Sequence, residues 1–326
     1  MIISRTPLRI SFFGGGSDYK EWLSHSRGEV ISTTIDKYVY ISIRNLPKFF
    51  NHHFRISYSK IEDIKKIQHI KHHAIKGILK HYNQSSGLEI HYDGDLPAKS
   101  GMGSSSAFVV GFLKAYYKLH KKKNISNIDL AKKSIFIEQS VLRENVGIQD
   151  QIACACGGFK NIQFEKKNIK IVDLRIKKKI LKNLNSNLFL IYSKIQRRAH
   201  KIASSFTNKI VEPNKNIATI LDQVTIAKLL LKKGQLDEFG ELLGENWAIK
   251  KKLSNQISNS YIDKLYEQAI ASGATGGKIL GAGGGGFFLF YVPKKNHGKF
   301  KKKFLKNNLS INFNFETNGS KLIYEN

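Results

Sequence analysis

The stretch DGDLPAKSGMGSSSAFVVGFLKAYYKLH, residues 93–120, most constrains how this chain of 326 residues can fold. A short strand signal, Leu88 to Tyr92, ends just before it at Asp, Gly and Pro residues. Gly101 and Gly103 let the backbone turn tightly and approach a ligand closely, and three serines then open an amphipathic helix. The free N–H groups of a first helical turn, together with the helix dipole, favour an anion. The stretch therefore predicts a phosphate-binding loop, with a plain helix cap as the alternative.

Two common phosphate-binding patterns do not fit this chain. The Walker pattern requires Ser or Thr after Gly-Lys, and neither Gly277-Lys278 nor Gly298-Lys299 is followed by one. A dinucleotide fingerprint would need a glycine where Ser106 stands, inside a compact strand-helix-strand unit. If the loop binds phosphate, it does so by a different pattern.

Hydrophobic patterning places strands and helices in separate runs. Strand signals rich in β-branched and aromatic residues occur in ISRTPLRISFF, DKYVYISIRNL and GLEIHYDGDLP. A helix follows the serine-rich loop, another begins at Ser126, and GGFKNIQFEKKNIKIVDLRI predicts a hairpin. The second half starts with NLFLIYS and continues with helices expected near residues 217–231, 236–253 and 261–272, before the glycine cluster KILGAGGGGFFLFY. This order predicts an α+β fold with two domains, residues 1–180 and 181–326.

The charge balance is strongly basic, with a formal net charge of +29. Of the 54 basic residues only nine are arginine, and the lysines are scattered rather than placed among aromatic residues. Proteins that bind nucleic acid specifically concentrate arginine and interleave aromatic groups, so we expect no specific nucleic-acid partner. A run of eighteen apolar residues is absent, and MIISRTPLRISFF does not resemble a secretion signal. We therefore expect a soluble, cytoplasmic protein without a membrane partner.

The helix expected after Ser126 carries a carboxylate in its apolar stripe. Glu138 completes a series of residues at steps of three and four: Ile128, Ala131, Ile135 and Leu142. A buried carboxylate is costly unless it is paired or binds a cation. With Ser105 as a second protein ligand, Glu138 suits a magnesium ion that keeps phosphate oxygens and waters as its other ligands. The alternative is a glutamate that reaches solvent or forms a salt bridge.

A second polar group interrupts the apolar stretch NVGIQDQIACACGG. Asp150 lies there between two glutamines. A base or an orienting carboxylate beside phosphate would explain an aspartate in such surroundings. A structural, hydrogen-bonded aspartate is the alternative.

Three motifs, in order, resemble those of the small-molecule kinases named after galactokinase, homoserine kinase, mevalonate kinase and phosphomevalonate kinase, the GHMP superfamily. They are RTPLRISFFGGGSDY, LPAKSGMGSSSAF and GGKILGAGGGGFFLF, and together they span Arg5 to Phe290. The resemblance implies a two-domain fold with the active site in the cleft between the domains, and ATP and Mg²⁺ as cofactors. Within the superfamily, GGGSDY, STTIDKYVY, GIQDQ and the third motif are most similar to kinases of D-glycero-D-manno-heptose 7-phosphate.

The resemblance also assigns residues. The ATP phosphates would be held by the loop from Ser100 to Ser106: Ser100, Gly101, Met102, Gly103, Ser104, Ser105 and Ser106. Magnesium would be held by Ser105 and Glu138, and Asp150 and Arg9 would face the acceptor hydroxyl as catalytic residues. The sugar itself would be bound by Gly15, Gly16 and Asp18 and, from the third motif, by Gly283 and Gly284.

Two features go beyond the shared motifs. In galactokinases bulkier residues stand where this chain has Gly15 and Gly16, which makes galactose a poor candidate and leaves room for a larger acceptor. A substrate with its own phosphate needs cations, and IYSKIQRRAHK offers Arg197 and Arg198, for which a basic surface helix is the alternative.

The implied activity is phosphorylation of the anomeric oxygen of heptose 7-phosphate to the 1,7-bisphosphate, for nucleotide-heptose and surface polysaccharide synthesis. Another sugar such as fucose, a catalytically silent sugar and ATP sensor, and a polyanion-binding protein are the alternatives. The sequence leaves open whether the protein forms a homodimer.

Overall fold

Two long antiparallel strands organise the structure, a computed structural model that describes residues 1–120, 125–165, 168–196, 199–207 and 214–326. They are β1 (Ile2–Phe13) and β2 (Gly28–Asn45), paired from Ile2 opposite Ile43 to Phe13 opposite Ile31. Both strands are rich in β-branched and aromatic residues. Every residue of β1 from Thr6 to Phe13 is buried. The sequence prediction of strands in these two stretches is confirmed.

A larger sheet is built on this pair. In the described residues it has nine strands, six of them in the order β13-β1-β2-β5-β3-β4, with β12 and β6 on β2 and β7 on β6. The added strands are β3 (Phe54–Ser57), β4 (Ile61–Ile64), β5 (Leu88–Gly94), β6 (Lys160–Glu165), β7 (Asn168–Asp173), β12 (Phe315–Glu316) and β13 (Lys321–Glu325). β6 and β7 form the expected hairpin.

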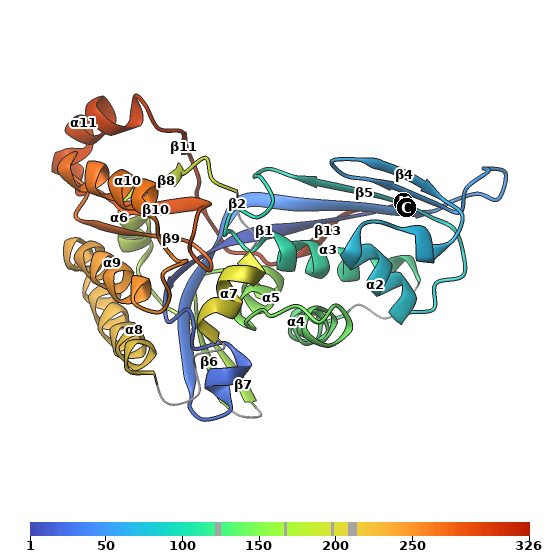
Figure 1. The fold of residues 1–326 in the computed structure, drawn as a ribbon, viewed down its shortest axis with the longest axis horizontal. Coiled ribbons are helices and arrows are strands. Elements are labelled where there is room, and N and C mark those ends of the chain that lie inside the picture. The colour runs from blue at the N-terminus through green and yellow to red at the C-terminus, as the bar shows by residue number, and fades with distance from the viewer. Residues whose placement is uncertain (121–124, 166–167, 197–198, 208–213) are drawn as a thin grey trace.

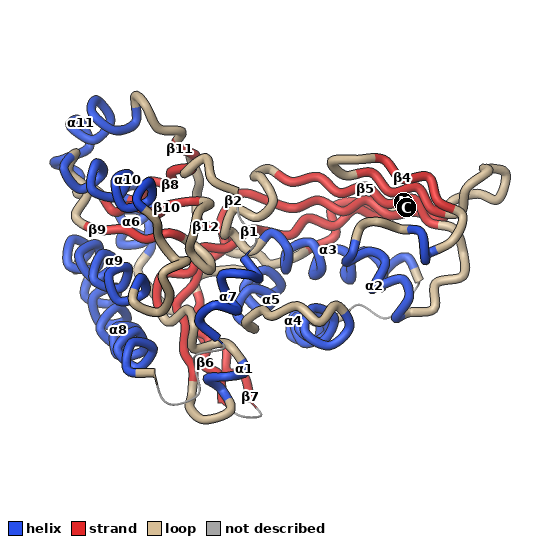
Figure 2. Tube along the Cα trace, viewed as in Figure 1, coloured by secondary structure: helices blue, strands red, loops and turns tan. Residues whose placement is uncertain are grey.

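Helices cover one side of the larger sheet, as Figure 2 shows. The central one is α3 (Ser104–Leu119), which starts at the serine-rich loop and buries Phe108, Phe112 and Ala115. Around it lie α2 (His73–His81), α4 (Asn127–Phe136) and α5 (Gln149–Cys156), with the short α1 (Lys20–Leu23) and η1 (Ile67–His69) in the connections.

A smaller sheet lies at the other end of the molecule. Its order is β11-β8-β10-β9, from β8 (Leu188–Tyr192), β9 (Gly276–Ile279), β10 (Phe287–Tyr291) and β11 (Ser310–Ile311). The helices of this half are α6 (Lys178–Asn187), α7 (Ala199–Thr207), α8 (Lys215–Lys233), α9 (Leu236–Lys251), α10 (Ser260–Ala271) and α11 (His297–Phe300), with η3 (Lys294–Asn296) and η4 (Lys301–Leu305). The three long helices predicted for this half correspond to α8, α9 and α10.

The two halves are joined by strands and by side chains. The end of β1 packs on α9, where the rings of Phe12 and Phe239 are 5.6 Å apart, and Lys228 of α8 forms a 2.7 Å ion pair with Glu29 of β2. After the smaller sheet, β12 and β13 return to pair with β2 and β1. The α+β class is confirmed, and the division at residue 180 stays a prediction, since the last strands of the chain pair with the first.

One helix differs from its prediction. α4 begins at the predicted cap, where Ser126 Oγ accepts from the Asp129 backbone N–H at 3.1 Å, but it passes into a π-helical turn, η2 (Ile137–Val141). The predicted apolar stripe is wrong at Ile128, which is 52% exposed, whereas Glu138 is fully buried. The buried residues of this helix recur at a regular helical period, Leu130, Ala131, Ser134, Ile137 and Glu138, and Ile128 in the first turn lies outside that face.

In the described part of the chain, the structure contains no helix that is long and apolar enough to cross a membrane.

The glycine cluster of the third motif, residues 281–286 and called the third glycine cluster below, contacts the phosphate loop, and this contact gives a stability prediction. Phe287 N–H donates to Ser100 O at 3.0 Å, and Gly286, with a φ of +90°, lies so close that a Cβ would be 2.2 Å from Ser100 O. Gly286→Ala should therefore lower the free energy of unfolding by about 1–3 kcal/mol, through backbone strain and this clash. Urea unfolding measures it.

The matched control is Gly298→Ala, because a Cβ at Gly298 meets nothing within 4 Å. Equal effects of the two substitutions would contradict the proposed close contact.

Candidate active site

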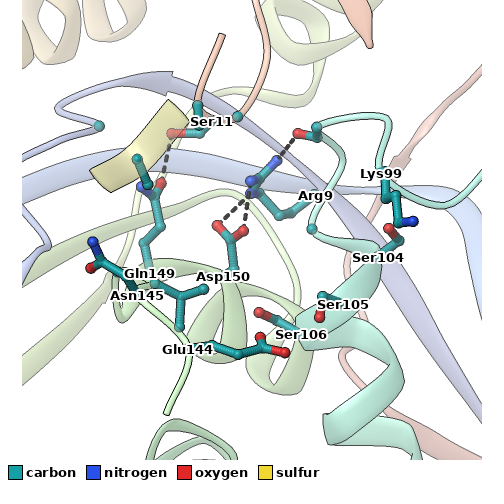
Figure 3. Close-up of a pocket in the computed structure, with 18 of the residues that line it drawn as sticks. Arg9, Ser11, Lys99, Ser104, Ser105, Ser106, Glu144, Asn145, Gln149 and Asp150 are labelled. Atoms are coloured by element: carbon teal, nitrogen blue, oxygen red, sulfur yellow. Dashed lines mark hydrogen bonds and ion pairs between the residues drawn. The ribbon is translucent and has the colours of Figure 1, made fainter. Parts of the chain in front are cut away.

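A cavity of about 880 Å³ lies between the two halves of the molecule. Its walls come from β1 and the Gly15–Gly16 turn, from the first turns of α3 and α5, and from α9, β9 and the third glycine cluster in the second half. Polar residues from β1, α3 and α5 meet at the end shown in Figure 3. The expected cleft between the halves is present.

The phosphate loop forms one wall of this cavity. Gly101 and Gly103 have φ values of +84° and +74°, which glycine adopts without strain, and Met102 is buried beneath them. Gly103 is the N-cap of α3 and, as a glycine, has no side chain that could cap the helix. The first turn of α3 therefore lines the cavity without a side-chain cap from its N-cap residue, which leaves N–H groups for a phosphate.

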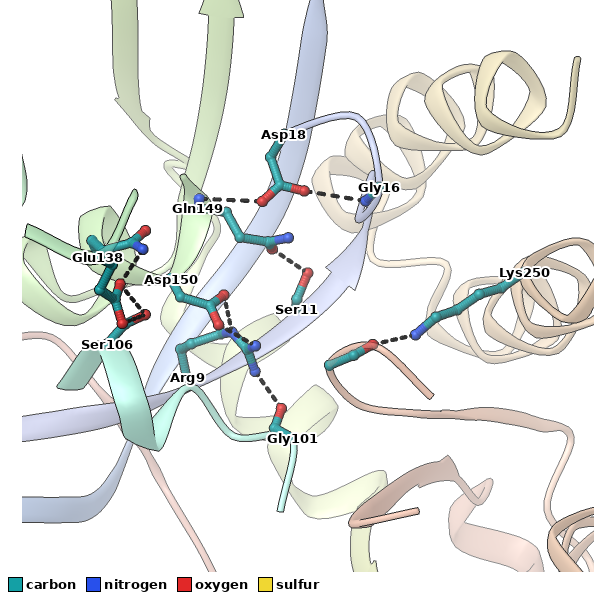
Figure 4. Close-up of polar contacts among 12 residues, drawn as sticks. Arg9, Ser11, Gly16, Asp18, Gly101, Ser106, Glu138, Gln149, Asp150 and Lys250 are labelled. Atoms are coloured by element: carbon teal, nitrogen blue, oxygen red, sulfur yellow. Dashed lines mark hydrogen bonds and ion pairs between the residues drawn. The ribbon is translucent and has the colours of Figure 1, made fainter. Parts of the chain in front are cut away.

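Arg9 connects the loop to α5. Its Nε and Nη2 donate to the two carboxylate oxygens of Asp150 at 2.6 and 2.7 Å, and its Nη1 donates to Gly101 O at 2.6 Å. Burial opposes the charge of Arg9, yet the interactions with Asp150 raise the pKa of Arg9 above its ordinary value. Asp150 thus has a fixed orientation beside the phosphate loop (Figure 4).

Asp18 is a second buried carboxylate in the cavity wall. Its oxygens accept from the backbone N–H of Gly16 at 3.1 Å and of Gln149 at 3.3 Å. Gly147 has no room for a side chain, because a Cβ there would be 1.9 Å from Asp18 Oδ2. Burial, and next the charge of Asp150, raise the pKa of Asp18 to about 6, although hydrogen bonds from Gly16 and Gln149 lower it.

Ser11 and Gln149 lie next to the Arg9–Asp150 pair. Ser11 Oγ donates to Gln149 Oε1 at 2.7 Å. Arg9 and Ser11 are two positions apart in β1, so their side chains lie on the same side of the strand. Gln149 and Asp150 are consecutive at the start of α5. Two parallel side-chain contacts therefore join β1 to α5 (Figures 3 and 4).

Glu138 lies behind the phosphate loop and is fully buried. It accepts from Ser106 Oγ at 2.8 Å and from the side-chain amide of Gln151. Burial, and next the charge of Glu144, raise the pKa of Glu138 to about 8. The serine in contact is Ser106, one position after the predicted Ser105, which is exposed on the cavity wall.

Two lysines line the wall that comes from the second half. Lys278 Nζ donates to Phe12 O at 2.6 Å and to Asn246 Oδ1 at 2.8 Å. Burial lowers the pKa of Lys278 to about 7, and the charge of Arg9 acts in the same direction. Lys250 Nζ donates to Ile279 O at 3.1 Å and to Gly281 O at 2.5 Å, so it holds the third glycine cluster.

The predicted sugar-binding residues have different positions. Gly15, Gly16 and Asp18 line the cavity. Gly283 and Gly284 instead pack on Ile257, to whose carbonyl Gly284 N–H donates at 2.7 Å, and neither is among the cavity-lining residues. Arg197 and Arg198 lie outside the described residues.

Several cavity residues were not predicted from the sequence: Ser11, His72, Tyr92, Lys99, Phe108, Gln149, Lys250 and Lys278. Two of them carried a usable signal. Ser11 lies two positions after Arg9 in a strand and so shares its face, and Lys278 is a charged residue inside a buried strand. The others come together only through long-range packing.

Comparisons with known proteins agree with this geometry. The family model for the GHMP kinases N terminal domain matches residues 68–158, and the model for the GHMP kinases C terminal domain matches residues 226–311. The chain belongs to the GHMP kinase superfamily, whose members are ATP-dependent phosphotransferases acting on a sugar or alcohol acceptor.

The individual relatives include sugar kinases and mevalonate kinases. The D-glycero-alpha-D-manno-heptose 7-phosphate kinase of Campylobacter jejuni is 29% identical over 98% of both chains. A solved structure described as a D-glycero-D-manno-heptose 1-phosphate kinase of Bacteroides thetaiotaomicron is 26% identical, with a TM-score of 0.79 over the full length of both chains. The bifunctional fucokinase/GDP-fucose pyrophosphorylase of Arabidopsis thaliana is 24% identical over 90% of this chain, which spans 30% of that protein.

The buried amine of Lys278 leads to a pH prediction. In the folded protein it has a pKa of about 7, whereas an unfolded lysine has about 10.4, so the unfolded chain binds the extra proton between these values. The free energy of unfolding of the unmodified protein should therefore rise, relative to Lys278→Met, as the pH increases from about 7 to about 10.

Urea unfolding of both proteins at several pH values measures this difference. The variant Lys232→Met, at an exposed position, corrects for the loss of one lysine. If the free energies of unfolding of the unmodified protein and of Lys278→Met differed by the same amount at every pH from about 7 to about 10, Lys278 would not be neutral in the folded protein.

Proposed function

We propose that this GHMP kinase phosphorylates the anomeric hydroxyl of D-glycero-D-manno-heptose 7-phosphate, giving the 1,7-bisphosphate. The observation that carries the proposal is the Arg9–Asp150 pair held against Gly101 of the phosphate loop, in a cavity also lined by Gly15, Gly16 and Asp18. The full-length similarity to the Campylobacter heptose 7-phosphate kinase supports this choice of acceptor. The product would serve nucleotide-heptose and surface polysaccharide synthesis in the cytoplasm.

The residues around the loop fit MgATP. The uncapped N-terminus of α3 suits phosphate, and the loop from Ser100 to Ser106 would hold it. Among the described residues no three His, Cys, Asp or Glu side chains form a metal cluster, which suits an ion that takes most of its ligands from phosphate and water. Glu138 and Ser105 would supply the protein oxygens, and a cation would offset the charges of Glu144 and Asp150, which raise the pKa of Glu138.

Asp150 and Arg9 would align the acceptor. When bound, MgATP supplies the phosphoryl group and magnesium offsets the charge on its oxygens. Asp150, held at both oxygens by Arg9, orients the acceptor hydroxyl and accepts its proton. Because Arg9 also binds Gly101 O, the hydroxyl and the phosphate loop are held in one fixed geometry, which is the main catalytic contribution expected for phosphoryl transfer.

Asp18, Gly15 and Gly16 would bind hydroxyl groups of the sugar. Asp18 has backbone donors on both oxygens and is positioned for further hydrogen bonds at the cavity wall. Arg197 and Arg198 would bind the 7-phosphate, and this assignment rests on the sequence alone.

A second candidate acceptor is fucose or another sugar that reacts at its anomeric hydroxyl. The similarity to the Arabidopsis fucokinase over 90% of this chain favours it over non-sugar acceptors.

The first test is an ADP-release assay with magnesium and ATP. The acceptors offered are heptose 7-phosphate, fucose, mannose, galactose and mevalonate. Turnover confined to the heptose phosphate supports the proposal, whereas turnover of an unphosphorylated sugar supports the second candidate. Binding of ATP without turnover on any acceptor would contradict the heptose proposal and point to an untested acceptor or to a sensor.

Asp150→Asn tests the catalytic assignment. The amide keeps the size of the side chain but is a poor proton acceptor, so kcat should fall by about 10²-fold or more. The melting temperature and ATP binding, measured in the same preparation, show that the variant is folded. Near-normal turnover in a folded variant would remove the base role and leave Asp150 with orientation only.

A further inference from the structure

Ser11 and Gln149 line the same cavity as Arg9 and Asp150. Their hydrogen bond is separate from the ion pair between Arg9 and Asp150. Both side chains are largely buried, with 7% and 8% of their surface exposed. Polar side chains buried at a cavity wall need a reason, because each unmet hydrogen bond costs free energy. Figure 4 shows the contact beside the Arg9–Asp150 pair.

The orientation of the Gln149 amide follows from its neighbours. Ser11 Oγ donates to Oε1 at 2.7 Å, and Nε2 lies beside Gly15, 3.7 Å from where a Cβ of that residue would be. Because the hydroxyl is the donor in this bond, its partner is the amide oxygen, and Nε2 is the atom beside Gly15. An amide nitrogen has two N–H donors, and the contact with Ser11 uses neither of them, so they can serve a ligand in the cavity that Gly15 and Gln149 line.

The adjacent glycine leaves this amide uncovered. Gly15 has a φ outside the left-handed region, unlike Gly14 and Gly16, so its backbone conformation does not require glycine. A Cβ at Gly15 would meet only Gln149 Nε2 at 3.7 Å and Ser11 Oγ at 3.8 Å, both ordinary contacts. The fold therefore tolerates a side chain at this position. A longer side chain would cover Gln149 Nε2 and Ser11 Oγ, so glycine leaves these two polar atoms accessible from the cavity.

From these contacts we propose that Gln149 is a specificity-determining residue that donates a hydrogen bond to a hydroxyl of the acceptor, next to the hydroxyl held at Asp150. Ser11 is its positioning residue, and Gly15 gives the acceptor access to it. The ligand chemistry is a polyol with adjacent hydroxyls, because consecutive residues of α5 would each bind one. The inference rests on the proposed function for the identity of the acceptor, but not for the location of the site.

The central variant is Gln149→Met, which keeps the length of the side chain and removes its donors. The KM for the acceptor should rise about 10-fold, while the KM for ATP stays within about twofold, because the lost contact involves only the acceptor. Calorimetric binding of the acceptor without ATP should weaken by the same factor. The acceptor used is whichever sugar the unmodified protein phosphorylates.

Two substitutions of increasing size at Gly15 test whether the acceptor reaches Gln149. They do not depend on whether Gln149→Met folds. Gly15→Ala should raise the acceptor KM less than Gly15→Val, and neither should change the KM for ATP. Gly298→Ala, where a Cβ meets nothing within 4 Å, is the remote control. An unchanged acceptor KM in Gly15→Val and Gln149→Met would overturn the proposal.

Ser11→Ala tests the positioning role by a double-mutant cycle. It should raise the acceptor KM in the unmodified protein but have no further effect in Gln149→Met, because Ser11 acts through Gln149. An additive effect would mean that Ser11 contacts the acceptor directly. Failure of the proposed function shows as turnover of a different sugar, or of none, by the unmodified protein, whereas failure of this inference shows only in the variants.

Discussion

The guanidinium of Arg9 joins three segments that are far apart in the chain. It donates twice to Asp150 of α5 and once to Gly101 of the phosphate loop, while its own backbone N–H bonds to Met102 O at 3.1 Å. A buried arginine without partners would be strongly unfavourable, so these contacts largely determine how β1, α5 and the start of α3 meet. The charged pair belongs to the site and also fixes the local structure around it.

The remaining walls of the cavity come from the second half of the chain and depend on how it packs against the strand that carries Arg9. Lys278 reaches from β9 to the carbonyl of Phe12 at the end of β1, just before the Gly14–Gly16 turn. The third glycine cluster lies so close to Ser100 that a Cβ at Gly286 has no room. The second half therefore contacts both the phosphate loop and the strand that leads into the Gly14–Gly16 turn, although the residues proposed to act in transfer come from the first half.

Local patterns in the sequence predicted most of the fold and part of the site. The glycines of the phosphate loop, the cap at Ser126 and the hairpin near residues 160–173 are determined by neighbouring residues, and the structure contains each of them. The pair of Ser11 and Gln149 could not be predicted in this way, since its members are 138 residues apart. The predicted face of α4 was wrong at Ile128, because the buried face runs through Leu130 and Ser134 instead. The return of β13 to β1 depends on pairing at the far end of the chain.

The central claim is that the pair formed by Arg9 and Asp150 holds the acceptor hydroxyl opposite the phosphate loop. The most direct measurement is a crystal structure with heptose 7-phosphate and a non-hydrolysable ATP analogue. The account predicts the anomeric oxygen within hydrogen-bonding distance of Asp150, and the nucleotide phosphates at the N-terminus of α3. A sugar bound with its anomeric oxygen away from Asp150, or phosphates bound at the third glycine cluster, would contradict it.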